Sequence, residues 1–163
     1  HMGNLVADAM LARVADQGVE IAIQNSGGLR ASIDAGEVTM GEVLAVLPVQ
    51  NTLSTFQVSG AELIEALENG VSQIEKAAGR LDPKAEVGSR ISDVMVSGMP
   101  IDPEKTYGMV SNNYVRNGGD GYATFKSAQN AYDYGPDLAD VTAEFIAKNG
   151  DYTPYIDGRI KIK

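Results

Sequence analysis

The chain has no cysteine and only one histidine, His1. Zinc sites and most other transition-metal sites take histidine or cysteine ligands. Catalysis by a Ser-His-Asp or Cys-His group needs the same residues. These absences exclude both kinds of site, whereas an all-oxygen calcium or magnesium site stays open. Since no Asp-x-Asp-x-Asp-Gly loop supports such a site, we predict no catalytic residue, metal or cofactor in this chain.

Long apolar runs and positive charge are also scarce. No apolar run approaches the roughly 20 residues of a membrane-spanning helix, and no signal peptide is visible. The net charge of −9 would repel a nucleic acid polymer. The 163 residues, 44% of them hydrophobic, are enough for one folded domain. We interpret residues 1–2 as a cloning scar and residues 3–163 as one domain.

Helix starts are marked by local capping signals. Thr39–Glu42 and Ser59–Glu62 each match a capping box. The second box is expected to begin a helix with an apolar stripe that extends to Ile74. Pro136–Asp137 is predicted to begin the last helix, which ends at Gly150. Apolar residues recur at helical spacing between Leu5 and Val14, so an N-terminal helix is predicted to stop near Gly18.

Strands are predicted where β-branched and aromatic residues gather, and residues 79–90 are expected to be irregular. The predicted strands are residues 19–25, 52–58, 91–96, 106–114 and 159–163. A turn joins the third strand to the fourth, so part of the sheet should be antiparallel. Helices and strands alternate without a βαβ rhythm. The sequence therefore predicts an α+β fold: a single domain with a mixed β-sheet packed with helices.

Two glycine-rich segments could bind a ligand or form ordinary turns. In “QNSGGLR”, backbone amides and Arg30 could hold an anion, or Arg30 could lie on the surface after a strand-exit turn. In “NNYVRNGGDGY”, Tyr114 offers a stacking surface and Asp120 a hydroxyl acceptor. The alternative for this segment is a hairpin whose tyrosines pack on the sheet.

Two further polar features are more typical of structure than of a site. In “LPVQNTL”, Asn51 could bind a ligand, but the spacing favours a helix-to-strand connection in which Asn51 bonds its own backbone. Glu62, Glu65 and Glu68 lie beside an apolar stripe. We interpret these three glutamates as a solvated helix face.

Four motifs occur in a specific order along nearly the whole chain after residue 2: “GNLVADAM”, “IQNSGGLRASIDAGEVTMGEVLAVLP”, “SGAELIEALENGV” and “YGMVSNNYVRNGGDGYATF”. In this order they resemble the C-terminal, substrate-binding domain of the 5′-nucleotidase family, which includes periplasmic UDP-sugar hydrolases. The resemblance implies a parent protein in the periplasm or outside the cell. It also implies an N-terminal metallophosphoesterase domain as partner, which holds two divalent metals and the catalytic residues.

The resemblance also assigns roles to five residues. It implies that Arg30 contacts the phosphate of a nucleotide and that Asn25 lies beside it. Asn51 would hydrogen-bond the base, and Tyr114 would form one side of an aromatic clamp on the base. Asp120 would accept hydrogen bonds from the ribose hydroxyls. The implied ligand is a nucleotide or nucleoside, with no membrane partner.

Three departures from the family pattern fall near the implied ligand site. Ser26 replaces a usual glycine, and Val49 stands where the second ring of the clamp normally follows Leu-Pro. Loss of one stacking partner costs about 1–3 kcal/mol, which is roughly ten- to a hundredfold in affinity. Near Arg80 the family usually carries a Phe-Pro-Gln-x-Ser-Gly segment and a strand that are absent here.

These features lead to one expectation and one alternative. We expect an isolated nucleotide-binding domain of a 5′-nucleotidase-like hydrolase, weak in nucleotide binding and without hydrolytic activity of its own. The alternative is a non-enzymatic scaffold that has lost ligand binding. Such a scaffold could form a homo-oligomer through an unpaired strand edge.

Overall fold

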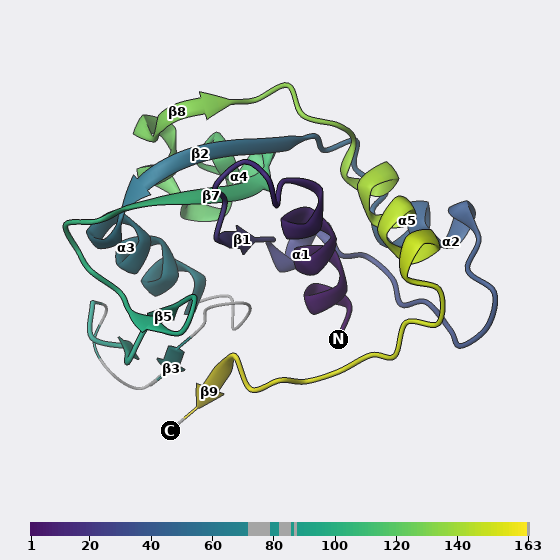
Figure 1. Ribbon diagram of the computed structural model, residues 1–163, viewed down its shortest axis with the longest axis horizontal. Coiled ribbons are helices and arrows are strands. Elements are labelled where there is room, and N and C mark those ends of the chain that lie inside the picture. The colour runs from purple at the N-terminus through teal and green to yellow at the C-terminus, as the bar shows by residue number, and fades with distance from the viewer. Residues whose placement is uncertain (72–78, 82–85, 87, 163) are drawn as a thin grey trace.

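The computed structural model of the chain describes residues 1–71, 79–81, 86 and 88–162. A four-stranded sheet in the order β1-β7-β2-β8 forms the centre of the fold (Figure 1). β1 runs parallel to β7, whereas β2 is antiparallel to both β7 and β8. These strands are β1 (Ile21–Ile23), β2 (Leu53–Ser59), β7 (Thr106–Asn112) and β8 (Gln129–Tyr132). The predicted α+β fold with a mixed sheet is therefore confirmed.

Helices and loops cover both faces of this sheet, and each face carries its own apolar core. On one face, Leu53 and Val110 of the sheet pack with α1, α2 and α5. On the other face, Phe56 and Met109 pack with α3, β5 and the loop that contains Phe125. The α-helices are α1 (Met2–Arg13), α2 (Met40–Val46), α3 (Gly60–Val71), α4 (Asn113–Arg116) and α5 (Leu138–Asn149).

The described residues also form two small sheets beside the central one. The order in the first is β4-β3-β9, and the second is the antiparallel hairpin β5-β6. Their strands are β3 (Gly79–Leu81), β4 (Ile91–Ser92), β5 (Met95–Val96), β6 (Met99–Pro100) and β9 (Ile160–Ile162). A long extended segment carries the chain from α5 to β9 (Figure 1), and β9 pairs in parallel with β3.

The helix starts confirm the capping signals. Before α2, the Thr39 hydroxyl accepts from the Glu42 amide at 3.3 Å, and the Glu42 carboxylate accepts from the Thr39 amide at 2.8 Å. Ser59 and Glu62 make the same reciprocal pair before α3, at 3.1 Å and 2.8 Å. Asp137 caps α5, which ends at Gly150 as expected. Met2 is the first residue of α1. The interpretation of residues 1–2 as a cloning scar stays a prediction.

Several strand and helix bounds differ from the predicted ones. The predicted strand 91–96 breaks into β4 and β5 at Asp93, whose φ of 56° is incompatible with extended backbone. The predicted strand 106–114 ends at Asn112, because the Asn112 side chain accepts from the Val115 amide at 2.9 Å and caps α4. Residues 79–81, expected to be irregular, form β3. The N-terminal helix ends at Arg13, short of Gly18.

The solvated helix face predicted for three glutamates is wrong for Glu68. This side chain is buried and accepts from the Gly88 amide at 3.0 Å and from the Ile91 amide at 2.8 Å. A buried carboxylate needs such donors, and here they tie α3 to the start of β4. Ile74, expected in the apolar stripe of α3, lies outside the described residues.

Tyr122 makes stability depend on alkaline pH. Burial, and secondarily the charge of Asp120, raise the pKa of Tyr122 from its ordinary value of 10.0 to about 12. The folded state therefore keeps a proton that the unfolded state releases, and stability is lost as pH rises from 10 through about 12. The slope from this group reaches about 1.4 kcal/mol per pH unit.

Chemical denaturation between about pH 9 and pH 12 measures this dependence. Tyr122→Phe is expected to flatten the decline in unfolding free energy. Tyr134→Phe, at a residue that is 85% exposed, is expected to leave the decline unchanged. Equal slopes for the two variants would contradict the assignment to Tyr122.

Candidate functional site

Three of the five residues singled out from the sequence lie together in the fold. The Asn25 Nδ2 donates to Asp120 Oδ2 at 2.7 Å, and the Tyr114 hydroxyl donates to Asp120 Oδ1 at 3.0 Å. We call Asn25, Tyr114 and Asp120 the Asp120 cluster. Asn25 and Asp120 are 95 positions apart in the sequence, so tertiary structure alone brings them together.

Asn25 is held in place by the ends of two neighbouring parallel strands. It follows β1, and Asn112 ends β7. The Asn112 Nδ2 donates at 2.9 Å to both Gln24 Oε1 and Asn25 Oδ1. All three side chains are buried. Because the side-chain oxygen of Asn25 accepts from Asn112, its Nδ2 is left to face Asp120.

Sequence analysis missed the supporting residues Gln24 and Asn112. A polar residue at the carboxyl end of a buried strand is a usable signal, because parallel strands bring such ends to the same sheet edge. Using that signal here required knowledge that β1 and β7 are neighbours. The sequence pattern predicted both strands but did not predict their pairing.

The loop that carries Tyr114 and Asp120 is a series of helical turns. Tyr114 lies on α4, and Asp120 lies in a 3-10 turn over Gly119–Gly121. The hairpin alternative for this segment is wrong, because β7 and β8 lie on opposite sides of β2. Asn69 of α3 anchors the turn, since its Nδ2 donates to the Asp120 carbonyl at 2.9 Å.

Glycine in this loop permits the close approach of the aromatic ring. A Cβ added to Gly119 would lie 2.4 Å from Cε1 of Tyr114, so only glycine lets the ring fold over the loop. Gly118 has φ of +86°, which other residues rarely adopt. Asp120 also has a positive φ, 52°, a conformation that aspartate tolerates better than most residues.

Asn51 lies on a turn that is fixed beside Tyr114. The Asn113 amide donates to the Thr52 carbonyl at 2.9 Å, and the Thr52 amide donates to Asn113 Oδ1 at 3.2 Å. Asn51 itself is buried, and its carbonyl accepts from the Leu138 amide at 2.8 Å. Val49, two residues earlier, is 50% exposed, and Tyr114 is 49% exposed.

Arg30 follows the same turn that begins after Asn25 but is bonded to a different element. It follows the 3-10 turn Ser26–Gly28, and its amide donates to the Val46 carbonyl at 2.8 Å. Its side chain is exposed. Among the described residues, no hydrogen bond or ion pair joins the Arg30 guanidinium to the cluster.

The described part of the chain contains no group of three or more histidine, cysteine, aspartate or glutamate residues that could hold a metal ion. None of its helices is long and apolar enough to span a bilayer. The Asp120 cluster itself offers a carboxylate, an amide and a half-exposed aromatic ring, which are groups that hydrogen-bond and stack.

Comparisons with known proteins agree on one family. A family model described as the 5′-nucleotidase C-terminal domain matches residues 1–127. The trifunctional nucleotide phosphoesterase protein YfkN of Bacillus subtilis (strain 168) is 36% identical over 178 residues, covering 99% of this chain and 12% of YfkN. The silent protein UshA(0) of Salmonella typhimurium is 32% identical over 154 residues, covering 91% of this chain and 27% of the relative.

A solved structure gives the same result. The 5′-nucleotidase precursor from Thermus thermophilus is 37% identical, with a TM-score of 0.93 over 99% of this chain and 35% of the solved chain. This chain thus spans about a third or less of the length of these relatives. With the family model matching most of its length, the chain belongs to the family of 5′-nucleotidase C-terminal domains.

Proposed function

We propose that this chain is the nucleotide-binding domain of a 5′-nucleotidase-like metallophosphoesterase. The observation that supports the proposal is the hydrogen-bonded convergence of Asn25, Tyr114 and Asp120 from two distant segments. A carboxylate beside a half-exposed aromatic ring suits a nucleoside, which has vicinal hydroxyls and a flat base.

Each residue of the Asp120 cluster has a distinct part in this proposal. Asp120 accepts hydrogen bonds from the ribose hydroxyls, one of which takes the place of the Tyr114 hydroxyl on Oδ1. Tyr114, released from that bond, stacks on the base. Asn25 keeps its bond to Oδ2 and so holds the carboxylate in position.

Two more residues complete the proposed ligand contacts. Asn51 hydrogen-bonds the base from the turn that Thr52 and Asn113 fix beside Tyr114. Arg30, with an exposed side chain, contacts the phosphate.

The aromatic clamp is incomplete in this chain, and a single substitution tests that statement. Val49 is half-exposed but cannot stack on a base. Val49→Phe adds a second ring and is expected to strengthen adenosine binding ten- to a hundredfold, because base stacking contributes about 1–3 kcal/mol. Isothermal titration calorimetry measures the change.

Val38→Phe is the matched control, since Val38 is also exposed but lies before α2. It is expected to leave adenosine affinity unchanged. Equal affinity of Val49→Phe and the original chain would show that something other than the missing ring limits binding.

Hydrolysis requires the partner domain. The two divalent metals and the catalytic residues belong to the N-terminal domain of the parent, which we place in the periplasm or outside the cell. With AMP and Mn²⁺ or Mg²⁺, the purified chain is therefore expected to release phosphate no faster than the same solution without protein. Full-length YfkN serves as the positive control. Metal-dependent release that scales with the concentration of this chain would contradict the proposal.

A scaffold that has lost ligand binding is the second candidate function. The observation in its favour is that both Asp120 carboxylate oxygens already have side-chain partners within the protein. A scaffold would show no saturable response to adenosine or AMP, whereas a nucleotide-binding domain would.

A further inference from the structure

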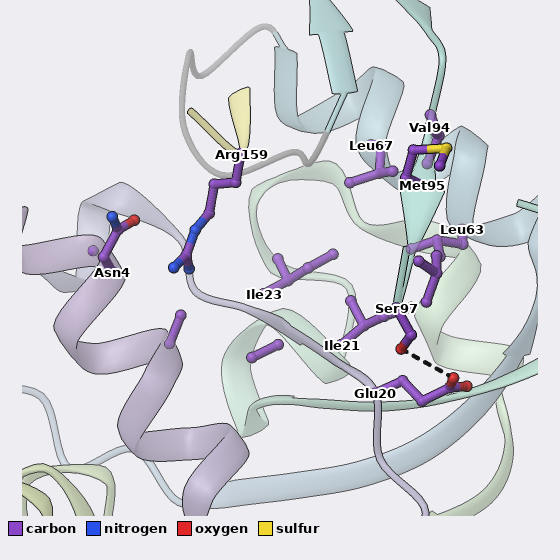
Figure 2. A pocket seen from close by; sticks show the side chains of 14 residues that line it. Asn4, Glu20, Ile21, Ile23, Leu63, Leu67, Val94, Met95, Ser97 and Arg159 are labelled. Carbon is purple, nitrogen blue, oxygen red and sulfur yellow. Dashed lines mark hydrogen bonds between the residues drawn. The ribbon is translucent and has the colours of Figure 1, made fainter. Parts of the chain in front are cut away.

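A cavity of about 230 Å³ lies between β1, α1, α3 and β5 (Figure 2). None of the five candidate site residues lines it. Most of its lining is apolar, with Asn4, Glu20, Ser97 and Arg159 as the polar members. The aliphatic lining side chains include Ile21, Ile23, Leu63, Leu67, Val94 and Val96.

The cavity follows the free edge of the central sheet. β1 is the first strand in the order β1-β7-β2-β8, and among the described residues it pairs only with β7. The four consecutive residues 20–23 all line the cavity. Successive side chains of a strand point to opposite faces, so a space lined by all four lies along the strand edge.

Backbone groups of β1 face this space. The Glu20 amide donates to the Gly108 carbonyl of β7 at 3.0 Å. In a parallel ladder, neighbouring residues of a strand direct their backbone groups to opposite sides. Ile21 therefore directs its N–H away from β7 and toward the cavity. An edge of this kind is a template for another strand.

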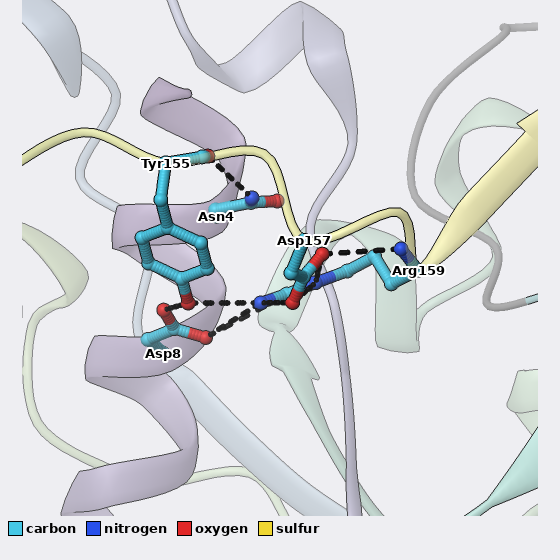
Figure 3. Close-up of polar contacts among 5 residues, drawn as sticks. All are labelled: Asn4, Asp8, Tyr155, Asp157 and Arg159. Carbon is cyan, nitrogen blue, oxygen red and sulfur yellow. Dashed lines mark hydrogen bonds and ion pairs between the residues drawn. The ribbon is translucent and has the colours of Figure 1, made fainter.

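The charged residues at the rim are already engaged by partners. The Arg159 side chain contacts Asp157 at 2.8 Å and Asp8 at 3.4 Å, so two carboxylates already balance its charge (Figure 3). Tyr155 donates to Asp8 and holds the same group on α1. The Glu20 carboxylate accepts from the Ser97 hydroxyl at 3.3 Å and lies 4.0 Å from the Lys105 Nζ. Each charged side chain in the described lining, Arg159 and Glu20, thus already has an oppositely charged partner.

A relative contains extra residues that bear on the occupant. The stretch matched with YfkN is 178 residues long, more than the 163 residues of this chain, so YfkN carries residues there that this chain lacks. Two of the cavity walls, α3 and β5, come before and after residues 72–90 in the sequence. A segment inserted between them would start and end at the cavity.

The geometry points to a binding site for an extended apolar peptide, which adds to the edge of β1 as a fifth strand of the central sheet. The backbone of the peptide pairs with β1, and its alternate side chains enter the aliphatic cavity. A peptide of about five residues with apolar side chains at alternate positions suffices for a strand of ordinary length. This inference does not depend on nucleotide binding.

The test uses a synthetic peptide that copies the YfkN residues between the counterparts of α3 and β4. Calorimetry is expected to show saturable 1:1 binding to the intact chain. Amide exchange followed by NMR is expected to slow at Ile21 at least about tenfold, because a paired amide exchanges only when the strand opens.

The control changes the peptide and not the protein, so a loss of binding cannot be caused by misfolding of a protein variant. The same peptide with proline at its centre loses a backbone donor and is expected to lose binding. Absence of saturable binding would overturn the inference, as would equal binding of the proline peptide or protection that spares Ile21. The chain alone could also form a dimer at high concentration in which the Ile21 amide is protected without peptide. That result would identify a second copy of the chain as the occupant and would likewise overturn the inference.

Discussion

Replacement of Asp120 by alanine is expected to weaken adenosine binding more than a hundredfold. The carboxylate is proposed to accept hydrogen bonds from two ribose hydroxyls, and a bond to a charged group contributes about 1.5–3 kcal/mol. Two such bonds exceed the roughly 2.8 kcal/mol that corresponds to a hundredfold change in affinity. Calorimetric titration of the variant and the original chain with adenosine measures the loss.

A second ligand separates the ribose contact from a general disturbance of the loop. The original chain is expected to bind 2′,3′-dideoxyadenosine much more weakly than adenosine, whereas Asp120→Ala is expected to bind both equally weakly. Asp34→Ala removes an exposed carboxylate elsewhere and controls for the change in net charge. If the variant still preferred adenosine over the dideoxy nucleoside, Asp120 could not be the ribose acceptor.

Replacement of Phe125 by alanine is expected to lower the free energy of unfolding by about 3–5 kcal/mol, the usual range for a buried phenylalanine. Phe125 is fully buried. Its ring lies 5.0 Å from that of Phe56 in β2 and 5.3 Å from that of Tyr122. Its carbonyl also accepts from the Arg116 guanidinium at 2.6 Å. The substitution would remove the aromatic contact between the sheet and the loop that carries Asp120.

Urea denaturation followed by circular dichroism measures this loss. Phe145→Ala is the matched control, because Phe145 on α5 is only partly buried and belongs to the core on the other face of the sheet. The control is expected to destabilise the chain by a clearly smaller amount. A similar loss of unfolding free energy in the two variants would show that Phe125 contributes no more to stability than a partly buried phenylalanine.

Local signals in the sequence predicted helix starts well. A capping box such as Thr39–Glu42 depends on residues three positions apart, so the interaction that fixes the helix start is visible in a short window. The same reasoning missed the cap at Asn112. There, the β-branched and aromatic residues of 106–114 favoured a longer strand, and the competing cap was formed by the first asparagine of an adjacent pair.

Predictions that depended on tertiary contacts were less successful. Glu68 lies in a pattern typical of a solvated helix face, yet its carboxylate accepts from two amides about 20 positions later. β8 was missed because all four of its residues are exposed and carry no alternation of apolar and polar side chains. Neither the partners of Glu68 nor the pairing of β8 with β2 can be predicted from a short stretch of neighbouring residues.

The same contrast between local signals and tertiary contacts holds for the candidate site. Local pattern left “NNYVRNGGDGY” open between a hairpin and a ligand loop, and the resemblance to a family supplied the roles of Tyr114 and Asp120. The structure then joined both residues to Asn25 through bonds that span 6 and 95 positions. The longer of these depends on the parallel pairing of β1 with β7, which no local signal predicted.

The most direct measurement is a titration of isotope-labelled chain with AMP, followed by the backbone and side-chain amide signals of Asn25, Asn51, Tyr114 and Asp120 in NMR spectra. Nucleotide binding at the Asp120 cluster predicts saturable shifts at these residues, with a single dissociation constant, and no shifts at Ile21 or Met95 of the aliphatic cavity. Spectra that stay unchanged at the highest soluble AMP concentration, or shifts confined to other surfaces, would contradict a nucleotide-holding role for this domain.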